Sequence, residues 1–239
     1  MQKLKSKKNI IIAVACVLLI AIAIGITLSY FTDEKDAENI FTFGDVRLNI
    51  VEPNYPQKAS DRVMYSESVI AKDPTIINIG SNSEYVYMLV SLPKESVTLL
   101  DENGQKINDT PEKTEIFKLM SNSENQLTEN NISYDSDWIF LGKNDSEDEC
   151  TYIFAYKDIL EKSGKTSTLF DKLQLKNFIE GELSENAVEN ISIKAYGIQA
   201  DNLIGVDLPS STDTRDELKE KLTSIYNIYA RQNEAGVIQ

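Results

Sequence analysis

The sequence predicts an all-β chain: an antiparallel β-sandwich with accessory helices, preceded by an N-terminal apolar leader helix. Short runs rich in β-branched and aromatic residues recur between turn signals, which is typical of sandwiches and barrels. Residues 191–198 alternate apolar with other side chains, the period of a strand with one buried face. Residues 10–28 form an uncharged apolar run that differs from everything after it.

The leader has the composition of an export signal. A positive head precedes the apolar run, and small residues stand at its end. Thr27 and Ser29 fit the −3 and −1 positions of a signal peptidase site, which predicts a cut after Ser29. The cleavage region comprises Thr27, Ser29, Tyr30 and Phe31. The run is also long enough to cross a bilayer, so a permanent anchor with its N-terminus inside stays open as the alternative. Both interpretations place the protein outside the cell, secreted or held at the surface.

The charge of the exported part excludes several partners. Removal of the four leader lysines from the 24 basic residues leaves 20 against 38 acidic residues, a net charge of −18. Such a chain is repelled by nucleic acid and by anionic membrane surfaces, so we expect contact with the membrane only through the leader. Cys150 is the single cysteine after the leader, so no internal disulfide is possible there, and we expect it to be inert.

Three domain segments are predicted: residues 1–29 as signal peptide or membrane anchor, 30–210 as the β-sandwich, and 211–239 as an amphipathic helix and tail. The polar region 101–136 is interpreted as an inserted excursion, with a helix near Pro111 to Met120. In the last segment, Thr212 or Thr214 can cap the helix. Its apolar positions recur at helical spacing: Leu218, Leu222, Ile225, Tyr226 and Tyr229.

Strand pairing is predicted from turns and alternation. Residues 75–79 and 85–90 are expected to form a hairpin, and 151–156 to pair back across the acidic turn 144–149. Residues 191–198 are expected to be a central strand with one face in the core. The predicted core residues are Val46, Leu48, Ile50, Ile77, Ile79, Val86, Met88, Val90, Trp138, Phe140, Ile153, Ala155, Ile191, Ile193, Ala195 and Gly197.

Catalytic groups are scarce in this sequence. It contains no histidine, which excludes Ser-His-Asp and Cys-His sites and the His-ligated zinc of zincin proteases. Carboxylates are so frequent that their proximity is unspecific, although a carboxylate-dependent hydrolase stays open. Asp101 through Asp109 has calcium-like chemistry, but it lacks the spacing of an EF-hand loop and is interpreted as a turn. No catalytic residue, cofactor or metal site is therefore predicted.

Several segments resemble SipW-dependent exported proteins, a group that includes the TasA biofilm-matrix fibre proteins and the camelysin-type surface proteins. The start of the exported part carries the most specific similarity, and shorter segments follow it. These segments are residues 30–33, 41–46, 48–53, 72–74, 77–80, 84–87 and 195–201. The excursion at 101–136 has no counterpart in this resemblance.

The resemblance implies a jelly-roll or Ig-like β-sandwich, removal of the leader by a dedicated signal peptidase, and residence in the extracellular matrix or on the cell or spore surface. It also implies fibre assembly by donor strands, with itself as a homopolymer or with a sibling fibre protein. The candidate donor strand comprises Ile40, Phe41, Thr42, Phe43 and Gly44, which supply apolar anchors, a β-favouring residue and a hinge. Camelysin-type relatives are described as metalloproteases, but this chain has no histidine, so that activity is not carried over. A membrane-anchored ectodomain that binds a ligand or partner is the alternative function, with the hydrolase as the third.

Overall fold

The computed structural model describes residues 46–58, 64–122, 127–129, 132–183, 191–232 and 238. The chain divides into two compact units, residues 1–36 and 37–239, and every described residue belongs to the second. The predicted leader helix lies outside the described residues. Within the described part, no helix is both long and apolar enough to cross a membrane.

The described part is built from antiparallel strands and one helix, which confirms the mostly β prediction at this level. The first strands are β1 (Leu48–Val51), β2 (Val69–Ala71), β3 (Thr75–Asn78), β4 (Glu84–Val97), β5 (Glu112–Glu115) and β6 (Phe117–Met120). They are followed by β7 (Leu127–Glu129), β8 (Ile132–Tyr134), β9 (Trp138–Asp145), β10 (Glu149–Tyr156), β11 (Lys172–Leu175), β12 (Ser192–Gln199) and helix α2 (Arg215–Gln232).

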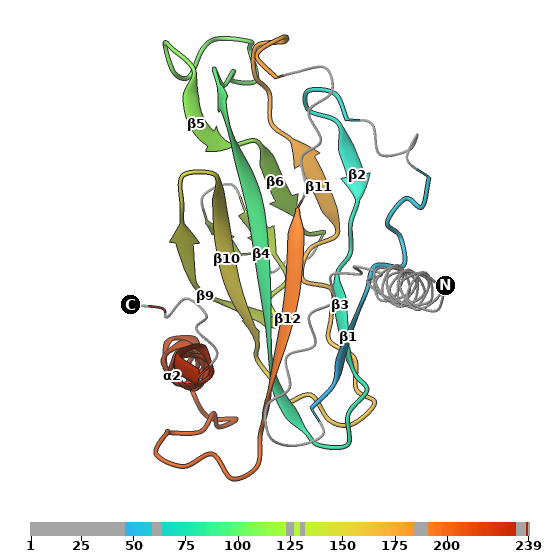
Figure 1. Cartoon of the computed structure of the whole chain (residues 1–239), viewed down its shortest axis with the longest axis vertical. Coiled ribbons are helices and arrows are strands. Elements are labelled where there is room, and N and C mark those ends of the chain that lie inside the picture. Colours follow the sequence, from blue (N-terminus) through green and yellow to red (C-terminus); the bar gives the residue numbers. More distant parts are fainter. Residues whose placement is uncertain are drawn as a thin grey trace, which may run out of the picture. The chain divides into compact units, whose positions relative to one another are not determined.

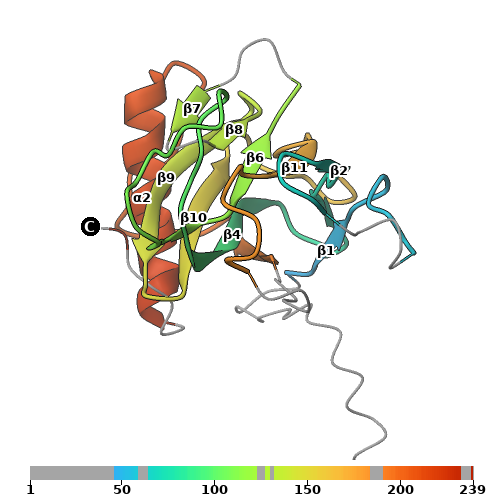
Figure 2. The same cartoon turned by 90° about the horizontal axis from the view of Figure 1, so that it is seen from above.

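The strands form one large sheet and three small ones. The large sheet has the order β12-β4-β10-β9, and β5 pairs with the far end of the long strand β4. The small sheets are β2-β11-β6, β1-β3 and β7-β8. Figure 1 shows β4 running through the middle of the molecule between β10 and β12. In Figure 2, α2 covers one face of the large sheet, while β1, β2, β6 and β11 lie on its other side.

The large sheet buries both of its faces, which is why β4 reads as a nearly continuous apolar run. Successive side chains point to opposite faces of a strand. Val86, Met88 and Val90 therefore join the first core, between the large sheet and the small sheets. Tyr85 and Tyr87 join the second core, between the large sheet and α2.

The hairpin of β9 and β10 confirms the predicted pairing across residues 144–149. Ser146 closes its turn, because its N–H and its hydroxyl both donate to the carbonyl of Glu149, at 2.9 and 2.8 Å. The ladder pairs Ile153 with Gly142 and Phe154 with Phe140, so the register shifts at this point. Trp138 and Phe140 face the first core as predicted.

Helix α2 packs where its apolar spacing predicts. Tyr87 and Tyr226 have ring centroids 5.3 Å apart, and Tyr196 and Tyr229 have theirs 5.0 Å apart. The Tyr87 hydroxyl donates to the Leu222 carbonyl over 3.1 Å, so a polar group carried into the second core is satisfied. All five predicted positions lie in or against the second core: Leu218, Leu222, Ile225, Tyr226 and Tyr229.

Three predictions of secondary structure and pairing need correction. Residues 75–79 and 85–90 do not form a hairpin, because β3 pairs with β1. Residues 191–198 are not central, because β12 stands at the end of the large sheet among the described strands and has neighbours on both of its faces. The helix near Pro111 to Met120 is wrong, because β5 and β6 occupy this stretch and pair with β4 and β11. Region 101–136 thereby contributes to both the sheets and the first core.

The prediction of which face of β3 is buried is also wrong, because the alternate residues point inward. Ile79 is 50% exposed and Ile77 is half-buried, whereas Ile76 and Asn78 point inward. Isoleucines stand at both parities of this stretch, so counting them cannot choose the face. The other corrections are smaller. Ile50, Ile191, Ile193 and Ala195 are only partly buried against the first core, and Ile153 and Ala155 belong to the second.

The start of α2 generates a stability prediction. Thr214 and Glu217 form a capping box: the Thr214 N–H donates to the Glu217 carboxylate over 2.8 Å, and the Glu217 N–H donates to the Thr214 hydroxyl over 3.4 Å. Thr214→Ala should lower the free energy of unfolding by about 1 kcal/mol, measured by urea titration. Thr212→Ala, two residues earlier in the same loop, is the control and should change it far less.

The pH dependence of this effect has a defined sign. Hydrogen bonds from Thr214 hold the pKa of Glu217 below its usual 4.5. The stabilisation is therefore complete above pH 4.5 and is lost as the pH falls through the lower, folded pKa. The stability difference between the parent chain and Thr214→Ala should shrink over that interval. A difference that stays constant down to pH 2 would contradict the capping role.

Candidate functional site

The residues predicted to carry function precede the described part, which begins at Val46. The cleavage region (Thr27, Ser29, Tyr30 and Phe31) and the candidate donor strand (residues 40–44) both lie outside it, so these assignments stay predictions. The structure describes the region into which they lead. We call this region the β1 junction; it comprises residues 46–55, residues 72–80, Glu84 and Gly197.

An ion pair holds the turn after β1. Lys72 Nζ donates to Glu52 Oε1 over 2.8 Å and lies 4.4 Å from the centroid of the Tyr55 ring. Lys72 is only 7% exposed, whereas the Glu52 side chain keeps part of its contact with water. Loss of one partner therefore costs less than the roughly 3–5 kcal/mol typical of a fully buried pair. The ion pair therefore ties the turn after β1 to the segment between β2 and β3, which contains Lys72.

Asp73 fixes the same turn with both of its carboxylate oxygens. Oδ1 accepts the Asn54 backbone N–H over 3.0 Å, and Oδ2 accepts the Asn54 side-chain amide over 2.7 Å. The residue is 5% exposed. This carboxylate is therefore occupied by hydrogen bonds that shape the chain, which is a structural role for it.

Asn78 connects two loops at the end of β3. Its side-chain amide donates to the Asn82 carbonyl over 2.8 Å and to the Leu160 carbonyl over 3.0 Å. Its Oδ1 accepts the Gly80 N–H over 2.9 Å. A fully buried amide is tolerated when its donors and acceptor are all used. This requirement explains why the polar residue Asn78 points inward in a stretch where the sequence analysis expected isoleucines to do so.

Gly197 must lack a side chain because Glu84 crosses it. A Cβ at position 197 would lie 2.3 Å from Glu84 Oε2, 2.9 Å from Val46 Cγ1 and 3.1 Å from Leu48 Cδ1. Glycine inside a strand often marks such a close approach. The sequence analysis placed Gly197 in the core, which is confirmed, but it did not identify Glu84 as the neighbour that excludes a side chain.

The described segments for which the sequence analysis noted a family resemblance meet at this junction. Residues 84–87 and 196–199 are cross-strand neighbours, with Val86 opposite Gly197 and Tyr87 opposite Tyr196. Residues 48–51 pair with 75–78 in the ladder of β1 and β3. Stretches separated by more than a hundred residues therefore build one region of the protein.

The β1 junction lies at the ends of two sheets. Among the described strands, β1 pairs only with β3, and β12 pairs only with β4. The Ile79 N–H donates to the Arg47 carbonyl over 2.8 Å, which extends the β1–β3 pairing by one residue toward the N-terminus. The first described residues thus lie along a sheet edge, in line with β1.

The single cysteine after the leader belongs to a buried polar cluster in the first core. The Tyr152 hydroxyl donates to Glu115 Oε1 over 2.9 Å, beside Cys150. Burial, with Glu115 nearby, raises the pKa of the Cys150 thiol to about 12. Burial also lowers the pKa of Lys176. The thiol therefore stays protonated at neutral pH and is a poor nucleophile.

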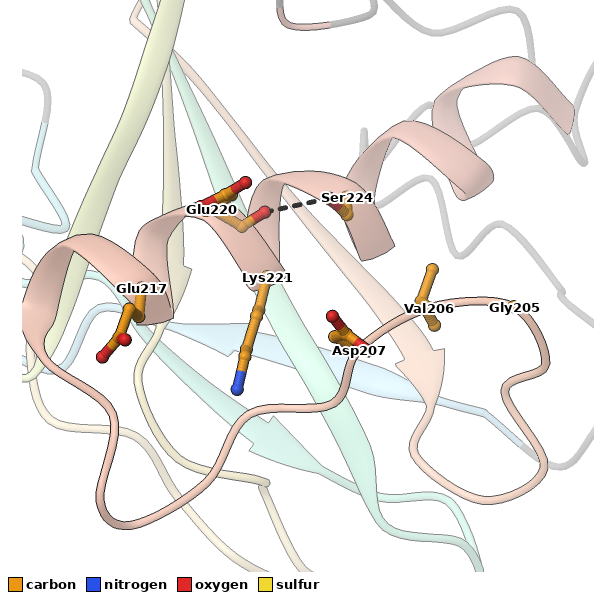
Figure 3. A pocket seen from close by; sticks show the side chains of 7 residues that line it. All are labelled: Gly205, Val206, Asp207, Glu217, Glu220, Lys221 and Ser224. Carbon is orange, nitrogen blue, oxygen red and sulfur yellow. Dashed lines mark hydrogen bonds between the residues drawn. The ribbon is translucent and has the colours of Figure 1, made fainter.

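A shallow hollow of about 440 Å³ lies between α2 and the loop after β12 (Figure 3). Three of the polar side chains that line it are already used within the chain. Lys221 donates to both carboxylate oxygens of Asp213 over 2.8 and 2.9 Å, Glu217 belongs to the capping box, and the Ser224 hydroxyl donates to the Glu220 carbonyl over 3.0 Å. The arrangement is that of a solvated groove beside a helix.

The calcium-like stretch after β4 is a turn, as predicted. Asp101 Oδ1 accepts the N–H groups of Asn103 and Gln105 over 2.9 and 2.8 Å, and Gly104 takes a φ of +74°. Over the described ranges, no group of three or more Asp, Glu, Cys or His side chains is arranged to hold a metal ion.

Comparison of the chain with protein-family models, with curated proteins and with solved structures found no match.

Gly197→Ala should destabilise the protein, because the new methyl group must displace Glu84 or Val46 in a filled interior. We expect a loss of about 1–3 kcal/mol in the free energy of unfolding, measured by urea titration. Lys194→Ala, at an exposed position of the same strand, is the control and should stay within about 0.5 kcal/mol.

A double-mutant cycle identifies the cause. In a Glu84→Ala background, Gly197→Ala should cost measurably less, because the nearest atom has been removed. Equal costs in both backgrounds would show that Glu84 is not what excludes a side chain at this position.

Cys150 should report unfolding of the first core. In a Cys16→Ser variant, which leaves Cys150 as the only thiol, maleimide labelling at pH 8 should be very slow for the folded protein and fast in urea. The raised pKa and the burial of the thiol both act in this direction. Labelling of the folded protein as fast as that of a free cysteine would contradict the described packing.

Proposed function

We propose that this chain is an exported structural protein of the extracellular matrix or of the cell or spore surface, related to the TasA-like and camelysin-type proteins. In this proposal it is not an enzyme. It assembles into fibres by N-terminal donor-strand exchange, with itself or with a sibling fibre protein as partner. A dedicated signal peptidase removes the leader in the cleavage region.

One observation carries the proposal: the described segments that resemble that family converge at the β1 junction. Gly197 of the late segment accommodates Glu84 of a middle segment and Leu48 of the early one. Lys72 of another segment pairs with Glu52. Unrelated short similarities would be expected to scatter over the fold. Their convergence supports a shared structural unit, and the finer fold that we assign to it is the jelly-roll or Ig-like sandwich.

Donor-strand exchange agrees with the position of the junction. The candidate donor strand, residues 40–44, ends two residues before Val46 in the sequence, so in this proposal it joins the fold just ahead of β1. A strand that adds to a sheet gains affinity from main-chain hydrogen bonds and specificity from alternate side chains. Phe41 and Phe43 share one face of an extended strand and would act as anchors. Exchange between copies costs little, because the same contacts form within one chain and between two chains.

A structural role also agrees with how the described polar groups are used. Asp73, Asn78 and Lys72 each hold loops or turns of the β1 junction in place. Cys150 is buried and protonated. These groups stabilise the sandwich, and the proposal assigns them no chemistry on a substrate.

The test compares processed protein that begins at Tyr30 with a version that lacks residues 30–43. Electron microscopy should show filaments only for the first. A length-matched control carries Phe41→Ser and Phe43→Ser, which removes the anchors but keeps the segment, and it should not form filaments either. Far-UV circular dichroism and labelling of Cys150 check that each variant is folded. Filaments from the shortened version, or none from the processed protein at high concentration, would contradict donor-strand exchange.

A further inference from the structure

A residue beyond α2 returns to the body of the fold. We call residues 233–239 the post-helix tail; within it, the structure describes Ile238. The Ile238 N–H donates to Asn227 Oδ1 over 2.9 Å, and the Asn227 side-chain amide donates to the Ile238 carbonyl over 2.9 Å. One side chain of α2 thus satisfies both main-chain groups of a single tail residue, much as a neighbouring strand would.

The side chain of Ile238 occupies the space left by the missing side chain of a glycine on β9. Ile238 packs against the second core. A Cβ at Gly142 would lie 3.0 Å from Ile238 Cγ2 and 4.0 Å from Ile238 Cγ1, and apart from its neighbours in the chain no other described atom lies within 4 Å. The missing side chain at position 142 therefore makes room for the tail and for nothing else among the described residues.

These two features have the properties of a peptide-binding site. The side-chain amide of Asn227 forms hydrogen bonds only with main-chain groups, so these bonds do not select for a particular residue type. The space above Gly142 favours an apolar side chain, because this side chain covers the end of a hydrophobic core. Figure 2 shows α2 and β9 lying side by side, and a segment held by both elements ties them together.

We propose that Gly142 and Asn227 form a notch that binds Ile238, the described residue of the post-helix tail, and that this contact acts as a latch on the last turns of α2. The proposal is independent of fibre assembly. It assigns a binding role to two positions that the sequence analysis did not single out. Its ligand class is a short extended peptide with an isoleucine-like side chain.

The experiment supplies the tail as a separate molecule. A variant that ends at Gln232 should show faster hydrogen exchange in residues 225–232 than the complete chain. A synthetic peptide with the sequence of residues 233–239 should bind this variant, seen as NMR shifts at Gly142 and at the Asn227 side chain, and should restore slow exchange. The same peptide with Ile238→Asp should neither bind nor protect.

Two helix variants separate the notch from general stability. Asn227→Ala in the shortened chain should abolish peptide binding. Ser224→Ala, one turn earlier, removes a hydrogen bond within the helix and should leave peptide binding unchanged. Absence of peptide binding together with exchange equal to that of the complete chain would overturn the proposal.

If the shortened chain does not fold, Gly142→Val in the complete chain replaces it. The added Cβ would lie 3.0 Å from Ile238 Cγ2, so the substitution should release Ile238 and speed exchange in residues 225–232 while exchange in β4 stays slow. Unchanged exchange in α2 would then overturn the latch.

Discussion

A sheet that is apolar on both faces is the constraint on which the rest of this fold depends. β4 places Val86 and Met88 on one side and Tyr85 and Tyr87 on the other, and every strand beside it must follow the same alternation. Neither face can be left in water, because exposing either would cost the hydrophobic stabilisation of a whole core. The small sheets cover one face and α2 covers the other. The helix is thus as necessary to the large sheet as its pairing strands are.

Polar side chains at the β1 junction solve a different problem. The loops that connect the sheets cross the end of the sandwich, where their main-chain groups would otherwise be buried without partners. Asn78 and Asp73 supply those partners, and Lys72 adds an ion pair with the Glu52 side chain, so that separate stretches of chain are held in one arrangement. Buried polar groups of this kind add order more than strength, since their hydrogen bonds replace equivalent bonds to water. This accounts for a region rich in charged and amide groups that shapes the fold.

The two ends of the described part join the fold by similar means. At one end, Arg47 accepts a hydrogen bond from Ile79 beyond the last pair of β1 and β3. At the other, Asn227 imitates a strand by bonding both main-chain groups of Ile238. In each case the chain is bound through its main-chain N–H or C=O groups. A sheet edge, or a side chain that offers the same donors and acceptors, can bind extended chain in this way. The proposed donor strand and the proposed latch use this same physics at opposite ends of the chain.

Local signals in the sequence determined a large part of this structure. The turn at residues 144–149, the presence of a strand at β12, and the helical spacing with its cap at Thr214 each depend on neighbours a few residues apart, and each is found. The candidate cleavage region and donor strand rest on sequence alone. Tertiary structure decided what depends on distant partners: that β3 pairs with β1, that residues 111–120 form strands against β4 and β11, and that Asn78 points inward. Isoleucines stand at both odd and even positions of residues 76–79, so the sequence alone does not show which face of the strand is buried. The face is decided by the hydrogen bonds from the Asn78 amide to loop carbonyls, which only the folded chain provides. The same holds for Gly142 and Gly197, whose neighbours Ile238 and Glu84 are about a hundred residues away and are brought to them only by the completed fold.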